Sequence, residues 1–194
     1  MDKNTNEEYY NWNSLINNDA RSRMCIDIRK QVDDEEYSLD LPKYQVMDVF
    51  KFGTEDWTNL GMSFIWSCFA YLKKEVKFIN LQSWSYMTSL KFSENRDILW
   101  HNHYKSDETN TLSGVYYLYL PKDIDLLTAG TEMAPNGVNA DHKTRYFAEA
   151  KVGNWLIYHG EKWHRPGILQ SLEDRFVVAA DMVVKKNIQV WGMK

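Results

Sequence analysis

Two histidines separated by one residue, His101 and His103, begin the stretch of this chain that is richest in possible chemistry. On an extended strand, side chains two positions apart project from the same face, so this pair can grip one ion. Two carboxylates, Asp107 and Glu108, follow within reach of a turn. The β-branched and aromatic run over residues 115–120 then predicts a strand. These features together predict one half of a metal site.

The other half is expected downstream, because two imidazoles from one strand would hold a metal weakly. An apolar strand predicted over residues 154–158 runs into a short loop that delivers His164. His159 is a second candidate at the strand end, where exposure is the competing interpretation. His142 lies in a charged loop, where a surface position is expected. We therefore predict His164 as the downstream ligand.

The elements that must position these residues are mostly short strands. We predict strands over residues 24–29, 44–52, 78–84, 85–92, 98–104, 112–120, 146–150, 154–158, 176–184 and 188–191. Gly, Pro, Asn and Asp turns separate most of them, which favours an antiparallel sandwich or barrel over alternating βα units. The long polar connection over residues 122–145 is predicted to be a lid beside the site.

One amphipathic helix is predicted over residues 56–75, where apolar residues recur at three- and four-residue spacing. Residues 1–20 show neither helical nor strand periodicity clearly, so an irregular or weakly helical lead is expected. We predict a single domain over residues 1–194, in which residues 1–76 support a barrel core formed by residues 77–194.

This ordered set resembles the 2-oxoglutarate and Fe(II)-dependent oxygenases, in particular short phage and bacterial proteins related to prolyl hydroxylases. Residues 101–103, His-Asn-His, are similar to a variant of the family's His-x-Asp motif, and residues 112–118 are similar to the strand that follows it. A Gly-Thr-Glu turn comes at residues 130–132. His164 matches the distal histidine, and Arg175 matches a basic residue about ten positions on.

The resemblance covers roughly residues 78–183 and implies a mainly β fold with flanking helices, the double-stranded β-helix of jelly-roll and cupin-like barrels. It also implies Fe(II) and 2-oxoglutarate as cofactors, with oxidative decarboxylation to succinate coupled to oxidation of a substrate C–H bond. Arg175 would hold the remote carboxylate of 2-oxoglutarate through its planar fork. The competing interpretation is a surface arginine paired with Glu173 or Asp174.

The departure from the family pattern is His103, which stands where an aspartate is expected. Three ligand sets remain open. His103 and Asp107 can be the ligands across a widened loop, His101 and His103 can join His164 in an all-histidine site, or Glu132 can complete the triad. An all-histidine site would also suit thiol dioxygenases and non-redox zinc or nickel binding.

The spacing also resembles the two cupin motifs, with His101, His103, Glu108 and His164 as ligands. The departure is that no glycine precedes His101 at the usual place. This alternative is a cupin-type metal-binding protein or enzyme that does not use 2-oxoglutarate. A third hypothesis is an interaction protein on the same scaffold in which the histidines are incidental.

Aromatic residues on the ligand-bearing segments predict a substrate pocket. Strand alternation places Tyr117 and Tyr119 on one face, where a tyrosine could hydrogen-bond the 2-oxoglutarate carboxylate. The alternative is that these rings fill the barrel core. The substrate is expected to be a small molecule or a protein side chain.

Composition bounds the remaining possibilities. The formal net charge of -4 provides no general basic field, which argues against a nucleic-acid partner. Cys25 and Cys68 are too few for a disulfide framework and are expected to be free thiols. The first ten residues are polar and acidic, and no apolar stretch approaches about 18 residues, so a cytoplasmic protein without a membrane span is expected. No heptad pattern indicates an oligomer.

Overall fold

In a computed structural model, the strands form two antiparallel sheets that face one another. The structure describes residues 9–34, 45–89, 100–134, 137 and 145–186. The larger sheet has the order β1-β7-β4-β9-β3-β2 and the smaller sheet the order β6-β5-β8. The elements are β1 (Tyr10–Asn13), α1 (Asn18–Asp34), β2 (Gln45–Met47), the 3-10 turn η1 (Val49–Lys51), α2 (Glu55–Leu72), β3 (Phe78–Thr88), β4 (Thr109–Tyr119), β5 (Thr131–Ala134), β6 (Tyr146–Ala148), β7 (Asn154–His159), β8 (Trp163–Pro166) and β9 (Arg175–Lys185).

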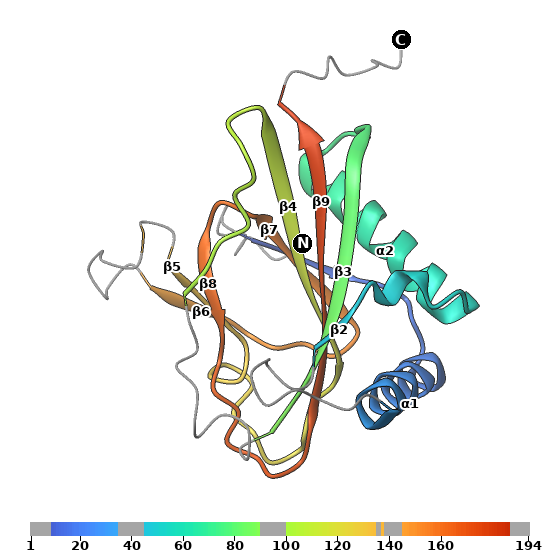
Figure 1. Ribbon diagram of the computed structural model, residues 1–194. Helices are drawn as coiled ribbons and strands as arrows, with labels where there is room; N and C mark the ends of the chain where they lie inside the picture. The colour runs from blue at the N-terminus through green and yellow to red at the C-terminus, as the bar shows by residue number, and fades with distance from the viewer. Residues whose placement is uncertain (1–8, 35–44, 90–99, 135–136, 138–144, 187–194) are drawn as a thin grey trace.

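The helices and the smaller sheet cover opposite faces of the larger sheet. Figure 1 shows α1 and α2 on one side of β3, β9 and β4, with β5, β6 and β8 on the other side. This is the predicted mainly β architecture with flanking helices, and its two facing sheets are those of a double-stranded β-helix. The space between the sheets is therefore the place to look for a site.

Strand β9 contributes to two buried regions, one between the larger sheet and the helices and one between the two sheets, because its side chains alternate between its faces. Phe176, Val178 and Ala180 belong to the main hydrophobic core, which lies under the helices. The intervening residues face the smaller sheet, and they include the two buried charged residues of the strand, Arg175 and Asp181. The polar chemistry of this strand is thus confined to the face between the sheets.

Helix α2 confirms the predicted amphipathic helix and packs its aromatic stripe against the larger sheet. The ring of Phe64, which is fully buried, lies 4.9 Å from the ring of Trp155 on β7. The indole of Trp57 donates a hydrogen bond of 2.8 Å to Asp27 on α1, which joins the two helices. Burial of such aromatic side chains supplies much of the free energy that holds a helix on a sheet.

The predicted strand over residues 24–29 is wrong, because these residues lie inside α1. Ala20, Met24, Ile28 and Val32 recur every four residues and are all buried, whereas Ile26 is 66% exposed. A four-residue period places side chains on one face of a helix. The alternation of Met24, Ile26 and Ile28 favoured a strand, but the four-residue spacing of the buried side chains is the pattern that the structure follows.

Other predicted boundaries change with tertiary pairing. The two strands expected over residues 78–92 are one strand, β3, as far as Thr88. A strand was expected over residues 98–104. In the described part of this range, residues 100–104, the structure has only an isolated β-bridge, between His101 and His164. The predicted lid over residues 122–145 contains β5, while its residues 135, 136 and 138–144 lie outside the described residues, as does the strand expected at 188–191.

The described part of the chain contains no helix that is both long and apolar enough to cross a membrane. Both cysteines are free thiols, Cys68 buried and Cys25 partly buried. Burial raises the pKa of Cys25 to about 12, so this thiol carries little thiolate at neutral pH.

Candidate metal centre

Three histidines from two distant segments converge between the sheets. One ring nitrogen from each of His101, His103 and His164 lies within 4.8 Å of the other two. Hydrogen bonds of the main chain produce this arrangement: His101 and His164 exchange N–H···O bonds of 3.1 and 2.9 Å, and the N–H of His103 donates to the carbonyl of Gly160 at 2.6 Å. The backbone thus fixes the relative positions of the three imidazoles.

Hydrogen bonds at Nδ1 also select the tautomer of two of these rings. His164 Nδ1 lies 3.0 Å from the carbonyl oxygen of Lys162, and His103 Nδ1 lies 2.6 Å from a carboxylate oxygen of Asp181. Because a carbonyl oxygen and a carboxylate can only accept, Nδ1 carries the proton in both rings. The lone pair then resides on Nε2, which is the nitrogen left to bind a metal.

The environment of His164 favours the form that binds a metal. This histidine is 4% exposed, and burial together with the neighbouring His101 lowers its pKa to about 3. A neutral imidazole is required for coordination, so the ring is ready to bind at neutral pH. Three closely spaced imidazole nitrogens form a donor set that suits iron, zinc, copper or nickel.

The structure does not bring the predicted carboxylates into this cluster. Asp107 is exposed and accepts a hydrogen bond of 2.7 Å from the hydroxyl of Tyr104. Glu108 is also exposed. Glu132 forms an ion pair with Arg165 at 2.6 Å. Its neighbour Met133 lies opposite His164 in the smaller sheet, so the Glu132 side chain projects from the other face of that sheet. Of the predicted ligand sets, the geometry assembles the all-histidine set.

Two site residues carried no predicted role. Asp181 on β9 and Ser113 on β4 are directly paired in the larger sheet. The Ser113 hydroxyl donates a hydrogen bond of 2.7 Å to the Asp181 oxygen that contacts His103. The available signal was an aspartate within an otherwise apolar strand, since a buried carboxylate is rarely left without a partner.

Arg175 lies at the beginning of β9 on the face between the sheets and is 4% exposed. Its Nε donates to the hydroxyl of Thr88 at 3.2 Å, and its Nη1 donates to the carbonyls of Ala129 and Gly167 at 2.6 and 3.2 Å. These three acceptors are neutral. No described carboxylate forms an ion pair with Arg175, so this buried cation keeps its attraction for an anionic ligand.

The competing interpretation of Arg175 as a surface residue is excluded by its burial and by the contacts of its acidic neighbours. Asp174 pairs with Arg29 at 2.7 Å, and Glu173 accepts a hydrogen bond from the hydroxyl of Tyr119. The local sequence Glu-Asp-Arg suggested a surface charge cluster, yet the strand turns Arg175 inward while both acids face other partners.

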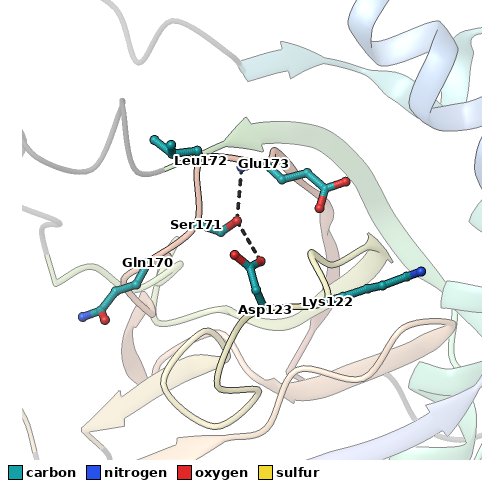
Figure 2. A pocket seen from close by; sticks show the side chains of 6 residues that line it. All are labelled: Lys122, Asp123, Gln170, Ser171, Leu172 and Glu173. Atoms are coloured by element: carbon teal, nitrogen blue, oxygen red, sulfur yellow. Dashed lines mark hydrogen bonds between the residues drawn. The ribbon is translucent and has the colours of Figure 1, made fainter.

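Two loops hold the carbonyls that contact Arg175, and they approach each other very closely. A side chain at Gly167 would bring Cβ within 2.0 Å of the Thr128 carbonyl oxygen, so only glycine fits there. Figure 2 shows a hollow beside these loops in which Asp123 and Ser171 point toward one another. The Ser171 hydroxyl donates to Asp123 at 3.0 Å, and this bond ties the two loops together.

The prediction that Tyr117 and Tyr119 share a strand face is wrong. The pairing of β4 with β9 shifts register between these residues, so the alternation is interrupted by a bulge. Tyr117 is buried, and its hydroxyl lies 3.1 Å from that of Thr131. Burial raises the pKa of Tyr117, and the positive charge of Arg175 opposes this shift. Tyr119 instead packs against Phe176 under the helices.

The different positions of Tyr117 and Tyr119 predict different outcomes for two matched substitutions. If the resemblance to 2-oxoglutarate oxygenases holds for the cofactor, Tyr117→Phe should weaken binding of 2-oxoglutarate about 2- to 10-fold, the effect of one lost hydrogen bond of about 0.5–1.5 kcal/mol. Tyr119→Phe should leave this affinity unchanged. Isothermal titration calorimetry of both variants checks the prediction, and equal effects would contradict the assignment of Tyr117.

Neither a protein-family model nor a curated protein sequence matches the chain. Several solved structures share its fold. AviO1 from Streptomyces viridochromogenes Tue57 has a TM-score of 0.67 and 12% identity, covering 94% of this chain and 92% of that one. EvdO2 from Micromonospora carbonacea var. aurantiaca has a TM-score of 0.69 and 10% identity, covering 100% of this chain and 95% of that one.

Two further solved structures that share the fold carry a named activity. SnoN, a non-heme alpha ketoglutarate dependent epimerase from nogalamycin biosynthesis, has a TM-score of 0.63 and 11% identity, covering 91% of this chain and 76% of that one. A Pseudomonas putida prolyl-4-hydroxylase has a TM-score of 0.60 and 10% identity, covering 91% and 88%. The chain therefore has the prolyl-hydroxylase-like fold of the 2-oxoglutarate oxygenase superfamily, which confirms the predicted resemblance at the level of the fold.

Proposed function

We propose that the chain is a non-haem Fe(II) enzyme that uses 2-oxoglutarate and oxidises a C–H bond of a protein side chain, an amino acid or a small metabolite. The observation that carries this proposal is the convergence of His101, His103 and His164 between the sheets. Structures of the same fold include one of SnoN in complex with Fe3+ and alpha ketoglutarate, which supports the choice of iron and of the oxo acid.

Each part of the site has a task in this proposal. His103 and His164 would bind iron through Nε2, and His101 would supply the third nitrogen. Arg175 would hold the distal carboxylate of 2-oxoglutarate, because its described partners are neutral and it is buried. Three protein ligands would leave room at the ion for the two donor atoms of a chelating oxo acid.

Bound iron and 2-oxoglutarate would supply the oxidising power of dioxygen: one oxygen atom would enter succinate as 2-oxoglutarate loses carbon dioxide, and the other would oxidise the substrate C–H bond. The protein's own contribution is to hold the metal through fixed tautomers, to orient the oxo acid from its far end and to limit access of water. Orientation of reactants in this way accounts for a large part of the rate enhancement in many enzymes.

The direct test is anaerobic addition of 2-oxoglutarate to the Fe(II)-loaded protein. A visible charge-transfer band is expected, because chelation of Fe(II) by an α-oxo acid creates a low-energy electronic transition. The Zn(II)-loaded protein should show no such band and is the matched control. An iron-loaded protein that develops no band would overturn the use of 2-oxoglutarate.

One observation favours a second candidate, a metalloprotein or dioxygenase that does not use 2-oxoglutarate. The assembled cluster contains histidine alone, and Asp107 and Glu108 are exposed outside it. If this candidate holds, 2-oxoglutarate should not raise the melting temperature of the metal-loaded protein, since only a ligand that binds the native state stabilises it.

A further inference from the structure

Asp181 is a buried carboxylate whose contacts all lead to the metal centre. It is 2% exposed, and one of its oxygens accepts hydrogen bonds from His103 Nδ1 at 2.6 Å and from the Ser113 hydroxyl at 2.7 Å. Among the described residues, no lysine or arginine pairs with it. Of the two described side chains that hydrogen-bond to this carboxylate, only the imidazole of His103 can carry a positive charge.

Such a carboxylate is expensive to bury unless positive charge lies nearby. A metal bound to Nε2 of His103 withdraws electron density from the ring and makes the Nδ1–H group a stronger donor. The bond to Asp181 then becomes charge-assisted, which is the stronger class of hydrogen bond. The buried charge and a bound metal would therefore stabilise each other through one imidazole.

We propose that Asp181 is the carboxylate of this centre and acts through His103 rather than on the metal itself. This inference rests on the metal binding proposed above. His103 stands where the family pattern has an aspartate, so the ion's direct ligands would be three neutral side chains. Asp181 supplies the negative charge from behind His103, raises the basicity of that ligand and fixes its orientation, as carboxylates behind metal-bound histidines do in other proteins.

The geometry argues against direct ligation by Asp181. Its carboxylate is not part of the group whose ligand atoms lie within 4.8 Å of one another. The contacting oxygen already accepts two hydrogen bonds, and Ser113 is its direct neighbour across β4 and β9. The pairing of two central strands therefore holds Asp181 behind the imidazole.

A Zn(II) titration of purified variants tests the proposal without any assay of activity. Asp181→Asn keeps the size of the side chain but removes its charge, and the loss of Zn(II) affinity should be about 10- to 100-fold. Asp174→Asn, the matched control at a surface ion pair, should bind Zn(II) like the wild type. Circular dichroism of each metal-free variant shows whether it is folded.

A double-mutant cycle separates action through His103 from direct ligation. In a His103→Ala background, Asp181→Asn should cause no further loss of Zn(II) affinity, because the imidazole that transmits its effect is missing. A further loss of tenfold or more in that background would overturn the proposal in favour of direct ligation. Unchanged affinity of Asp181→Asn in the His103-containing protein would also overturn it.

Histidine ¹⁵N NMR of the wild-type protein loaded with Zn(II) provides a test that needs no variant. His103 should show a metal-bound Nε2 and a protonated Nδ1 with a strongly downfield proton. Coordination through Nδ1 would overturn the inference while leaving the proposed metal site intact. A wild-type protein that binds no metal would overturn the proposed function and this inference together.

Discussion

His164→Ala should lower the affinity for Fe(II) and Zn(II) by more than about 100-fold, beyond the 10- to 100-fold typical of residues that only support a ligand. His164 contributes the most deeply buried of the three imidazoles, and its Nδ1 bond to the Lys162 carbonyl presents Nε2 to the other two rings. Without it, two imidazoles from one short segment remain. Metal analysis and calorimetric titration measure the change.

His159→Ala is the matched control for this experiment. His159 lies at the end of β7, is exposed and packs its ring edge-on against Tyr71, with the ring centroids 5.4 Å apart, outside the cluster. This variant should retain metal affinity and the metal-dependent rise in melting temperature. A His164→Ala protein that is folded and binds metal like the wild type would refute the proposed centre.

Arg175→Met should weaken binding of 2-oxoglutarate to the metal-loaded protein by about 2–4 kcal/mol, or roughly 30- to 700-fold. The methionine keeps much of the buried apolar volume but removes the positive charge expected to face the distal carboxylate. Affinity for the metal should change little, because Arg175 has no contact with the three histidines among its described hydrogen bonds. Separate titrations with metal and with 2-oxoglutarate measure both quantities.

A change of ligand controls for structural damage in the Arg175→Met variant. 2-Oxobutyrate has the same chelating oxo-acid end as 2-oxoglutarate but lacks the distal carboxylate. Its affinity should be nearly equal in the wild type and the variant. If the substitution weakens both oxo acids to the same extent, Arg175 maintains the loops of Ala129 and Gly167 and does not recognise the carboxylate.

The three histidines and the arginine could be predicted from the sequence because they depend on residue type and order. Two histidines two positions apart, a third beyond an apolar strand and an arginine opening the next strand indicated His101, His103, His164 and Arg175. Strand-like alternation in the second half of the chain predicted the barrel. Each of these signals is contained in a few consecutive residues.

The carboxylate of the site could not be predicted, because it depends on contacts between distant residues. Asp107 and Glu108 were favoured by being near His103 in sequence, yet both lie exposed. Asp181, 78 residues from His103, reaches it because β9 pairs with β4 and places Asp181 beside Ser113. No local pattern determines which strands become neighbours.

The sequence by itself determined the donor types, the strand-rich fold and the order of the segments that carry the histidines and the arginine. The tertiary structure decided which side chains meet. A bulge turned Tyr119 away from Tyr117, burial removed Arg175 from its acidic neighbours, and strand pairing placed Asp181 behind His103. The physical reason is that register and burial arise from packing of the whole chain, whereas the identity and spacing of the donors are local properties.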